Sequence, residues 1–368
     1  EGEDVDEILE IAEKGDFCDG EGELLRDYFM DEYSALLADR VRSACGNEKP
    51  LAGMKIIVDA GNGAGGFFTE KVLKPLGADT EGSLYLDPDG MFPHHAPNPE
   101  DKVAMATLKK AVLDNKADLG IIFDTDVDRA GAVDRKGEEI NRNRLIALIS
   151  AHLLEDKAGT IVTDSVTSDG LTKFIEEHGG RHHRYMRGYR NVIDECKRLN
   201  DAGEYSPLAV ETSGHCAFKD NYFLDDGAYL VTEILIILAG QLKKGKRLAD
   251  LISGLEEPAE AAEIRPEITC EDFREYGAKV LEKVKKAAAE IEGAKIAPNN
   301  YEGIRINFDK THGDGWLLIR MSLHEAILPI NVESNSTGGC KKMVKALLEI
   351  LCSCEYVDLS LLEKFIKE

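Results

Sequence analysis

One apolar run that leads directly into three alternating aspartates constrains this chain more than any other stretch. Residues Leu119-Gly120-Ile121-Ile122-Phe123 have the length and composition of a buried strand, and Asp124-Thr125-Asp126-Val127-Asp128-Arg129 follows at once. A second apolar segment, residues 130–133, then returns the chain to the core. This pattern places the carboxylates at the end of a core strand, which is where open α/β sheets bind their ligands.

Three carboxylates that converge on one turn favour a bound cation. Two of them held about 5 Å apart repel each other by roughly 3 kcal/mol at an effective dielectric constant of about 20. Mg²⁺ prefers oxygen ligands and leaves coordination positions open for a phosphate, so Asp124, Asp126 and Asp128 are candidate magnesium ligands and Arg129 is a candidate phosphate ligand. The competing interpretation is a solvated acidic turn, which is common in a chain with 69 acidic residues.

Length and composition limit the class of protein. The 368 residues are 43% hydrophobic and 31% charged, which is typical of a globular protein with several domains. The net charge of −24 argues against nucleic-acid and anionic-membrane partners. No apolar run reaches the 18 residues of a membrane span, and the eight scattered cysteines indicate reduced thiols, so we expect a cytoplasmic location.

The order of the predicted elements indicates an α/β fold: consecutive three-layer α/β domains with mixed sheets, followed by a C-terminal α+β domain. Residues 1–45 are predicted to form two or three amphipathic helices, interrupted near Gly15 to Gly22. Strands and helices then alternate over residues 46–141 and again over 142–258, and the composition changes over 259–368. A glycine-rich turn at residues 60–66 is predicted to lead into a helix that ends near Pro75.

Three later turns carry polar side chains that could bind an anion or a polyol. Arg187-Gly188-Tyr189-Arg190 concentrates positive charge in an acidic chain, although a solvated edge is an alternative there. Glu211-Thr212-Ser213-Gly214-His215 groups a carboxylate, a hydroxyl and an imidazole, which could bind a polyol. In Arg320-Met321-Ser322-Leu323-His324-Glu325, the arginine and serine could hold a phosphate.

The aspartate turn and these three later turns resemble, in the same order along the chain, the motifs of the α-D-phosphohexomutase family, which includes phosphoglucomutases and phosphomannomutases. The aspartate turn resembles the family's metal loop, D-x-D-x-D-R. Residues 188–190 resemble its G-[hydrophobic]-[K/R] loop, and residues 211–215 resemble its sugar loop, G-E-x-S-G-H. The turn at 320–325 resembles its phosphate loop, R-x-S-[GN]-T-E-P. The resemblance covers nearly the whole chain from about residue 50.

The resemblance implies a mutase that moves a phosphoryl group between C1 and C6 of a hexose phosphate, with Mg²⁺, through a hexose bisphosphate and a phosphoserine. It implies domain II at residues 46–141, domain III at 142–258 and domain IV at 259–368. Arg129 and His215 would be catalytic, and Asp124, Asp126 and Asp128 would hold the metal. The implied substrate-binding residues are Gly188, Tyr189, Arg190, Glu211, Ser213, Arg320, Ser322 and Glu325.

Two departures from the family pattern limit these expectations. The family's first domain carries its serine in a T-A-S-H-N-P loop, which this sequence lacks, so residues 1–45 are interpreted as a helical remnant of that domain. This chain alone is therefore expected to be inactive as a mutase. In the phosphate loop, Leu323, His324 and Ala326 replace the usual residues, which leaves the phosphate geometry and the preferred hexose open.

Two other functions fit parts of the sequence. Residues 121–127 also match the D-x-D-x-[TV] signature of haloacid-dehalogenase-like phosphatases, in which Asp124 would be the nucleophile and Asp225-Asp226 would supply the distal acids. The third aspartate and Arg129 have no role in that interpretation. A non-catalytic protein that binds sugar phosphates through Glu211 and Arg320 is the second alternative.

Overall fold

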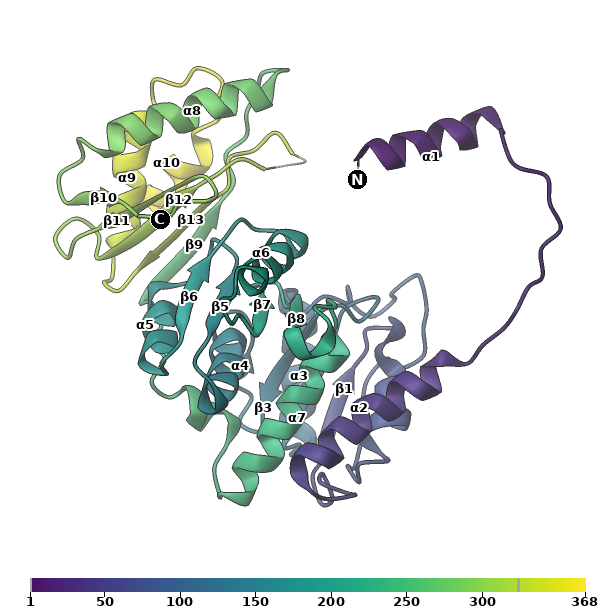
Figure 1. The fold of residues 1–368 in the computed structure, drawn as a ribbon. Coiled ribbons are helices and arrows are strands. Elements are labelled where there is room, and N and C mark those ends of the chain that lie inside the picture. Colours follow the sequence, from purple (N-terminus) through teal and green to yellow (C-terminus); the bar gives the residue numbers. More distant parts are fainter. Residues whose placement is uncertain (1, 323–324) are drawn as a thin grey trace. The chain divides into compact units, whose positions relative to one another are not determined.

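The computed structural model describes residues 2–322 and 325–368 (Figure 1). The chain divides into two compact units, residues 1–33 and 34–368. Helix α1 (Gly2–Lys14) lies in the first unit, and helix α2 (Phe29–Cys45) begins there and continues into the second. These two helices confirm the helical prediction for the N-terminal segment. Within the second unit, α2 buries Leu37, Ala38 and Val41.

The first sheet holds the aspartate turn at one end. Its strands are β1 (Ile56–Asp59), β2 (Leu119–Phe123), β3 (Ala130–Asp134) and β4 (Glu139–Ile140), in that spatial order. Strand β1 runs parallel to β2, whereas β3 is antiparallel to both of its neighbours, so the sheet is mixed. Helix α3 (Lys102–Asn115) begins at the N-cap Asp101 and packs on one face through Leu108 and Val112.

The segment after β1 differs from its prediction. The predicted glycine-rich turn contains a short 3-10 helix (η1, Ala64–Gly66), and the helix predicted to follow it contains a π-helical segment (η2, Thr69–Leu73) where a regular α-helix was expected. The glycines of η1 pack tightly against neighbouring chain: a Cβ added to Gly65 would lie 2.7 Å from the Phe123 ring, and one added to Gly66 would lie 2.0 Å from the Leu86 carbonyl oxygen. The packing here therefore requires glycine at both positions.

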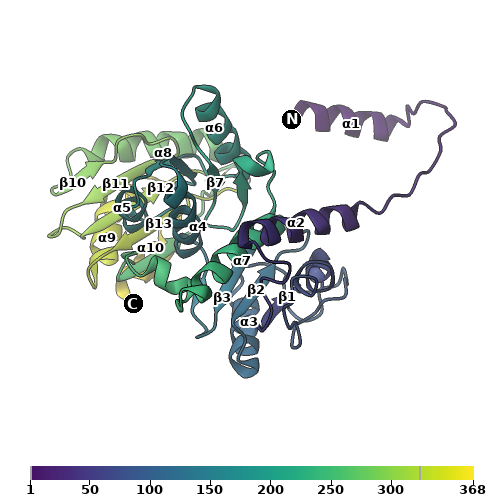
Figure 2. The ribbon, with the colours of Figure 1, turned by 60° about the horizontal axis from the view of Figure 1, so that its bottom comes forward.

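The second sheet has the order β6 (Arg181–Arg184), β5 (Thr160–Thr163), β7 (Leu208–Val210) and β8 (Cys216–Phe218). Strand β5 is parallel to β6 and β7, and β8 is antiparallel to β7. The helices of this region are α4 (Asn143–Asp156), α5 (Asp169–Glu177), α6 (Tyr189–Asp201) and α7 (Gly227–Lys243). Helix α7 is buried along most of its length and contacts both β8 and β3. Figure 2 shows it beside β3 of the first sheet.

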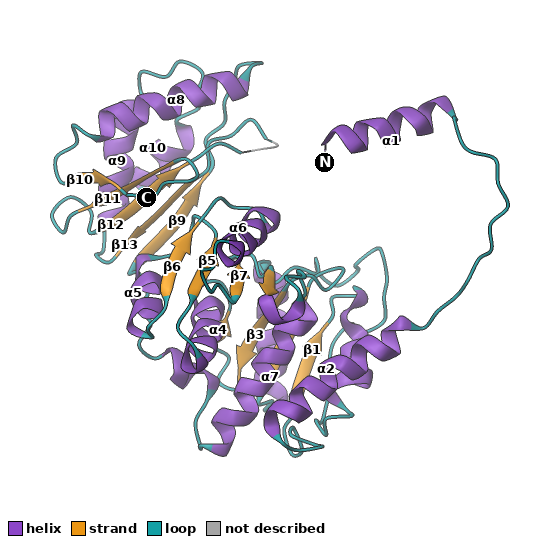
Figure 3. Cartoon of the chain, viewed as in Figure 1, coloured by secondary structure: helices purple, strands orange, loops and turns teal. Residues whose placement is uncertain are grey.

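The third sheet is antiparallel throughout, with the order β10 (Ala294–Ile296), β11 (Ile304–Phe308), β12 (Gly315–Ile319), β13 (Ile330–Ser334) and β9 (Glu260–Ile264). Helices α8 (Phe273–Ala288), α9 (Gly339–Leu351) and α10 (Ser360–Lys367) cover one face (Figure 3). Alternate apolar residues of β11, β12 and β13 pack against them, which is the period expected of a strand with one face in a core.

The other face of this sheet docks on the second sheet's loops. Arg305 lies over the Trp316 ring, 3.6 Å from its centroid. Its guanidinium donates hydrogen bonds to the carbonyls of Ser165 and Thr167 at 3.1 and 3.2 Å, and to Asp169 Oδ1 at 2.9 Å. A buried cation with this many acceptors fixes the C-terminal domain on the loop after β5.

The fold class is the predicted one: mixed α/β sheets in succession, then a C-terminal sheet domain. Among residues 2–322 and 325–368, the structure has no helix that is both long and apolar enough to span a membrane.

Candidate active site

The three aspartates of the predicted metal loop lie together. They occupy the hairpin between β2 and β3, whose register pairs Phe123 with Ala130. One carboxylate oxygen from each of Asp124, Asp126 and Asp128 lies within 4.8 Å of the other two. Asp124 is buried, Asp128 is half-buried and Asp126 is exposed, so the cluster opens toward solvent on one side.

Electrostatic strain in this hairpin is consistent with a divalent cation. Burial, followed by the neighbouring Asp124 carboxylate, raises the pKa of Asp128 to about 7. Asp128 Oδ1 is buried and has no hydrogen-bond partner among the described residues. Oxygen donors of this kind are the ligands that Mg²⁺ prefers, so the residues present fit that metal.

Arg129 holds the hairpin in shape. Its backbone N–H donates to Asp124 Oδ1 at 3.1 Å, and its Nε donates to Asp124 Oδ2 at 3.0 Å. One of its terminal nitrogens donates to Asn98 Oδ1 at 3.3 Å. Val127 adopts a positive φ of 73° at the tip, an uncommon conformation for a β-branched residue. Its carbonyl accepts the backbone N–H of Gly227 at 2.9 Å, which fixes that conformation.

The turn between β7 and β8 lies directly against this hairpin. His215 and Arg129 form an isolated antiparallel backbone bridge. Gly214, at a φ of 101°, approaches so closely that an added Cβ would lie 2.9 Å from the carbonyl oxygen of Ala130. The main chain itself therefore joins the aspartate hairpin to the predicted sugar-binding turn.

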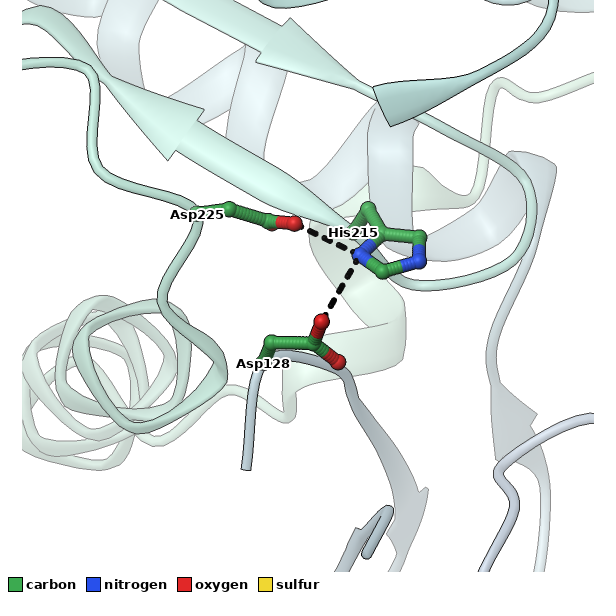
Figure 4. Close-up of side chains that lie close together, drawn as sticks. All are labelled: Asp128, His215 and Asp225. Atoms are coloured by element: carbon green, nitrogen blue, oxygen red, sulfur yellow. Dashed lines mark hydrogen bonds and ion pairs between the residues drawn. The ribbon is translucent and has the colours of Figure 1, made fainter. Parts of the chain in front are cut away.

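His215 is clamped between two carboxylates (Figure 4). Its Nδ1 hydrogen-bonds Asp225 Oδ2 at 2.7 Å and lies 3.6 Å from Asp128 Oδ2. The Tyr189 ring stacks on the imidazole with 5.1 Å between centroids. Burial acts to lower the pKa of His215, but the hydrogen bond and charge of Asp225, with Asp128 and Glu211 behind them, outweigh it and raise the pKa.

Glu211 connects this turn to the Gly188 loop. Its Oε1 accepts the Gly188 backbone N–H at 2.5 Å, and its Oε2 accepts the Ser213 hydroxyl at 3.2 Å. Burial raises the pKa of Glu211. Burial and the charge of Glu211 also raise the pKa of Asp164 to about 7, and the Oδ1 of Asp164 is buried without a hydrogen-bond partner among the described residues.

Arg320 follows β12 and reaches the same region from the C-terminal domain. Its Nη1 lies 3.6 Å from Glu302 Oε1, and Glu302 Oε2 accepts the Arg187 backbone N–H at 3.1 Å. Burial lowers the pKa of Arg320, opposed mainly by Glu302. The Ser322 hydroxyl accepts the Glu325 backbone N–H at 3.2 Å. Leu323 and His324, the altered positions of the predicted phosphate loop, lie outside the described residues, whereas the carbonyl of Ala326 accepts the Ile268 N–H at 2.7 Å.

A cavity of about 510 Å³ lies where the three sheet-containing regions meet. Residues from each region line it, including Lys102, Arg142, Arg187, Thr212 and Glu263. Its size is that of a small-molecule site. Its charged lining is mixed, because Glu100, Glu263 and Glu333 line it together with three basic side chains.

Comparisons with known proteins match this arrangement. Residues 31–137 match the family description "Phosphoglucomutase/phosphomannomutase, alpha/beta/alpha domain II", and residues 141–258 match the corresponding domain III. A phosphoglucomutase of Neisseria meningitidis is 30% identical over 355 residues, covering 95% of this chain and 72% of the relative. This chain is a member of the α-D-phosphohexomutase family.

Other phosphohexomutases agree in sequence and in structure. A phosphomannomutase/phosphoglucomutase of Pseudomonas syringae is 28% identical over 343 residues, covering 93% of this chain and 68% of the relative. A crystal structure of a phosphoglucomutase/phosphomannomutase family protein from Burkholderia thailandensis superposes with a TM-score of 0.77 at 25% identity, covering 96% of this chain and 70% of that one. A structure of an Aspergillus fumigatus N-acetylphosphoglucosamine mutase, 14% identical with a TM-score of 0.56, contains GlcNAc-6P and magnesium and supports the fold alone for this chain.

The comparisons support the phosphohexomutase interpretation and neither alternative. The geometry gives the second acid of the phosphatase interpretation a different role. Asp225, the residue proposed as part of a distal acid pair, binds His215 and the Cys216 backbone N–H instead.

The sequence-predicted residues of the phosphohexomutase site fall into two groups. Contacts join the aspartate hairpin, His215, Tyr189, Glu211 and Gly188 into one network. Arg320 joins that network through Glu302. Arg190 is exposed and pairs with Asp194 at 3.9 Å, one turn along α6, and Glu325 is also exposed.

Sequence reasoning missed several contributors to this phosphohexomutase site. Asn98 binds Arg129, Asp164 lies beside Glu211, and Glu302 binds the Arg187 loop. Asp225 was noted only as a possible phosphatase acid. Asp164 directly follows β5, a strand end that could have drawn attention to it, whereas Glu302 precedes its strand and carries no such signal.

Proposed function

We propose that this chain binds a hexose phosphate together with Mg²⁺ and contributes the metal, sugar and phosphate sites of a mutase that moves a phosphoryl group between C1 and C6. The observation that carries the proposal is the backbone bridge between Arg129 and His215, which joins the three-carboxylate hairpin to the turn proposed to bind the sugar. Membership of the phosphohexomutase family supports the same reaction.

The residues of the aspartate hairpin would have two different roles. Asp124, Asp126 and Asp128 would hold the metal, which neutralises charge on a transferring phosphoryl group when it is bound. Arg129 would bind phosphate oxygens beside it. Catalysis of this kind depends mostly on positioning and electrostatics.

His215 is the group proposed to exchange a proton with the reacting sugar hydroxyl. Because Asp225 engages Nδ1 at 2.7 Å, Nε2 is the nitrogen left for the substrate. Glu211 and Ser213 would accept and donate hydrogen bonds to the sugar hydroxyls. Tyr189 would keep the imidazole in place by stacking, and Gly188 would present its backbone.

The substrate phosphate would be held by Arg320 and Ser322 of the C-terminal domain, with Arg190 and Glu325 at the rim. A hexose phosphate that turns over as a bisphosphate would present each phosphate in turn to this site. The proposed partners are therefore a hexose phosphate and a hexose bisphosphate. The acidic net charge supports the absence of nucleic-acid and membrane partners, and the free cysteines support the proposed cytoplasmic location.

Calorimetric titration of the 368-residue chain tests the proposal. We expect glucose 6-phosphate, mannose 6-phosphate or N-acetylglucosamine 6-phosphate to bind, more tightly with Mg²⁺ than without, and the unphosphorylated sugars to bind far more weakly. The ranking of the three would identify the preferred hexose. Equal affinity for the phosphorylated and unphosphorylated sugars would contradict the proposal.

A further inference from the structure

Glu302 of the C-terminal domain contacts two loops of the domain that contains the second sheet. It precedes β11 in the C-terminal domain, and its half-buried side chain extends to the loops after β5 and β6. The Ser165 hydroxyl donates to its Oε2, as does the Arg187 backbone N–H at 3.1 Å. Its other oxygen lies 3.6 Å from Arg320 Nη1. One carboxylate thus links the phosphate-binding arginine of the proposed site to the domain that binds the sugar.

A second carboxylate, from Glu211, binds the residue next to Arg187. The N–H of Arg187 is bound by Glu302, and the N–H of Gly188 is bound by Glu211. Two adjacent backbone amides of one loop therefore donate hydrogen bonds to two carboxylates, one in the proposed sugar site and one beside Arg320. A change at Glu302 would alter one of these hydrogen bonds, in the loop that leads into Tyr189.

Arg320 is under-coordinated in this arrangement. Its ion pair with Glu302 is too long for a hydrogen bond, and its Nε is buried without a hydrogen-bond partner among the described residues. A guanidinium with unused donors is suited to a planar pair of phosphate oxygens. Glu302 and a phosphate would compete for the same cation, since both are anions.

Glu302 is one of the links between the two domains that bear on this loop region. Arg305, three residues along, makes docking contacts to Ser165, Thr167 and Asp169 through a separate guanidinium. A neutral side chain at position 302 that keeps a hydrogen-bond acceptor would leave the Arg305 contacts in place. The effect of the Glu302 charge on phosphate binding can therefore be tested with this docking contact intact.

We propose that Glu302 is an internal competitor for the substrate phosphate. Without substrate, its carboxylate pairs with Arg320 and binds the N–H of Arg187. A phosphate monoester dianion replaces Glu302 as the partner of Arg320. The negative charge of Glu302 then weakens phosphate binding, so that the phosphate can dissociate and be exchanged. In a reaction that must present first one phosphate and then the other to the same arginine, such exchange favours turnover. The inference rests on the proposed function, because it requires Arg320 to bind phosphate.

The decisive experiment compares Glu302→Gln with the native chain in calorimetric titrations of inorganic phosphate and glucose 6-phosphate. Glutamine keeps an oxygen for the Ser165 and Arg187 hydrogen bonds but removes the charge. We expect affinity for both ligands to rise by about tenfold, because a like charge beside the bound anion is removed, and affinity for glucose to stay unchanged. Unchanged or weaker phosphate binding would overturn the proposal.

Three further variants make the result specific. Glu302→Asp keeps the charge but moves it away from Arg320, so we expect a phosphate affinity between those of the native chain and Glu302→Gln. If Glu302→Gln does not fold, Glu302→Asp serves as the test. An aspartate variant that binds phosphate no more tightly than the native chain would then contradict the proposal. Glu267→Gln removes an exposed charge of the same domain and should change affinity less than about twofold.

Arg320→Met separates this inference from the proposed function. If it leaves phosphate affinity unchanged, the proposed phosphate site is wrong, and the role of Glu302 falls with it. If it weakens phosphate binding while Glu302→Gln binds as the native chain does, the proposed site stands and only the competitor role is wrong.

Discussion

Arg129 and His215 are paired through their backbones in an antiparallel bridge, although they belong to different sheets and lie 86 positions apart in the chain. The bridge is supported on both sides by glycine. Gly214 passes within contact of Ala130, and the N–H of Gly227 binds the Val127 carbonyl at 2.9 Å. The spacing between the proposed metal and sugar sites is therefore set by main chain, which side-chain rotation cannot alter.

Gly227→Ala should disturb this junction. An added Cβ would lie 2.8 Å from both the Arg129 carbonyl carbon and the Val127 carbonyl oxygen, which are backbone atoms that cannot move aside easily. We expect a loss of roughly 1–3 kcal/mol in the free energy of unfolding and weaker Mg²⁺ binding. Gly240→Ala in the same helix has open space around its Cβ and should be neutral or stabilising. Urea unfolding of both variants checks this, and equal stabilities would contradict it.

Asp126→Asn isolates the proposed metal site from folding. Asp126 is exposed, so its amide should leave stability nearly unchanged while removing one charged ligand from the carboxylate cluster. We expect Mg²⁺ affinity to fall at least about tenfold, measured by calorimetry or by competition with Mn²⁺. Asp114→Asn, an exposed acid on α3 paired with Lys110, serves as the control for net charge. Identical Mg²⁺ affinities in the two variants would argue for a merely solvated turn.

The aspartate hairpin could be predicted because its geometry is local. An apolar strand followed by acids at alternate positions and by a second apolar segment indicates a strand and a turn, and β2 and β3 are joined by that turn. The alternation of strands and helices over residues 46–258 was predicted from the same kind of pattern. A helix ending near Pro75 was expected to be regular, but residues Thr69–Leu73 are π-helical, and the tight contacts of Gly65 and Gly66 before it come from Phe123 and Leu86, outside the local pattern.

The partners of the site residues could not be predicted from local pattern. Asp225 reaches His215, Asn98 reaches Arg129, and Glu302 reaches Arg187 only through tertiary folding. Each is an ordinary polar residue in a chain rich in acids, so composition gives it no distinction. Only the tertiary hydrogen bonds of these residues show what they do.

Glu211→Gln tests the sugar side of the site. Glutamine keeps one acceptor for the Gly188 N–H but replaces a charged acceptor by a neutral one, so hydrogen bonds to sugar hydroxyls should weaken. We expect affinity for hexose phosphate to fall roughly tenfold, with Mg²⁺ affinity unchanged because the aspartate hairpin is intact. Titration of both ligands distinguishes this result from a general loss of structure, which would lower the two affinities together.

Stability should fall as pH rises through the titration of Glu333. Burial raises its pKa from 4.5 to about 7, so between those values the folded state binds more of this proton than the unfolded state does. The free energy of unfolding should thus decrease by roughly 2 kcal/mol across that window through this group. Glu333→Gln should remove that part of the slope in urea unfolding at pH 5 and pH 7.5, whereas Glu349→Gln, an exposed residue on α9, should leave it intact. An unchanged slope for Glu333→Gln would show that the carboxylate is solvated in the folded chain.

The 368-residue chain is expected to bind hexose phosphate without interconverting glucose 1-phosphate and glucose 6-phosphate. The mechanism implied by the family needs a serine phosphate as donor, and the sequence contains no T-A-S-H-N-P loop. Three serines near the site are hydrogen-bonded to acidic residues: Ser213 donates to Glu211, Ser165 donates to Glu302, and Ser322 accepts the Glu325 N–H. An assay coupled to glucose 6-phosphate oxidation, with the phosphoglucomutase of Neisseria meningitidis as positive control, measures the conversion. Turnover by this chain above background would mean that one of these serines, or another group in the cleft, carries the phosphoryl group, and mass spectrometry of the chain after reaction would then locate it.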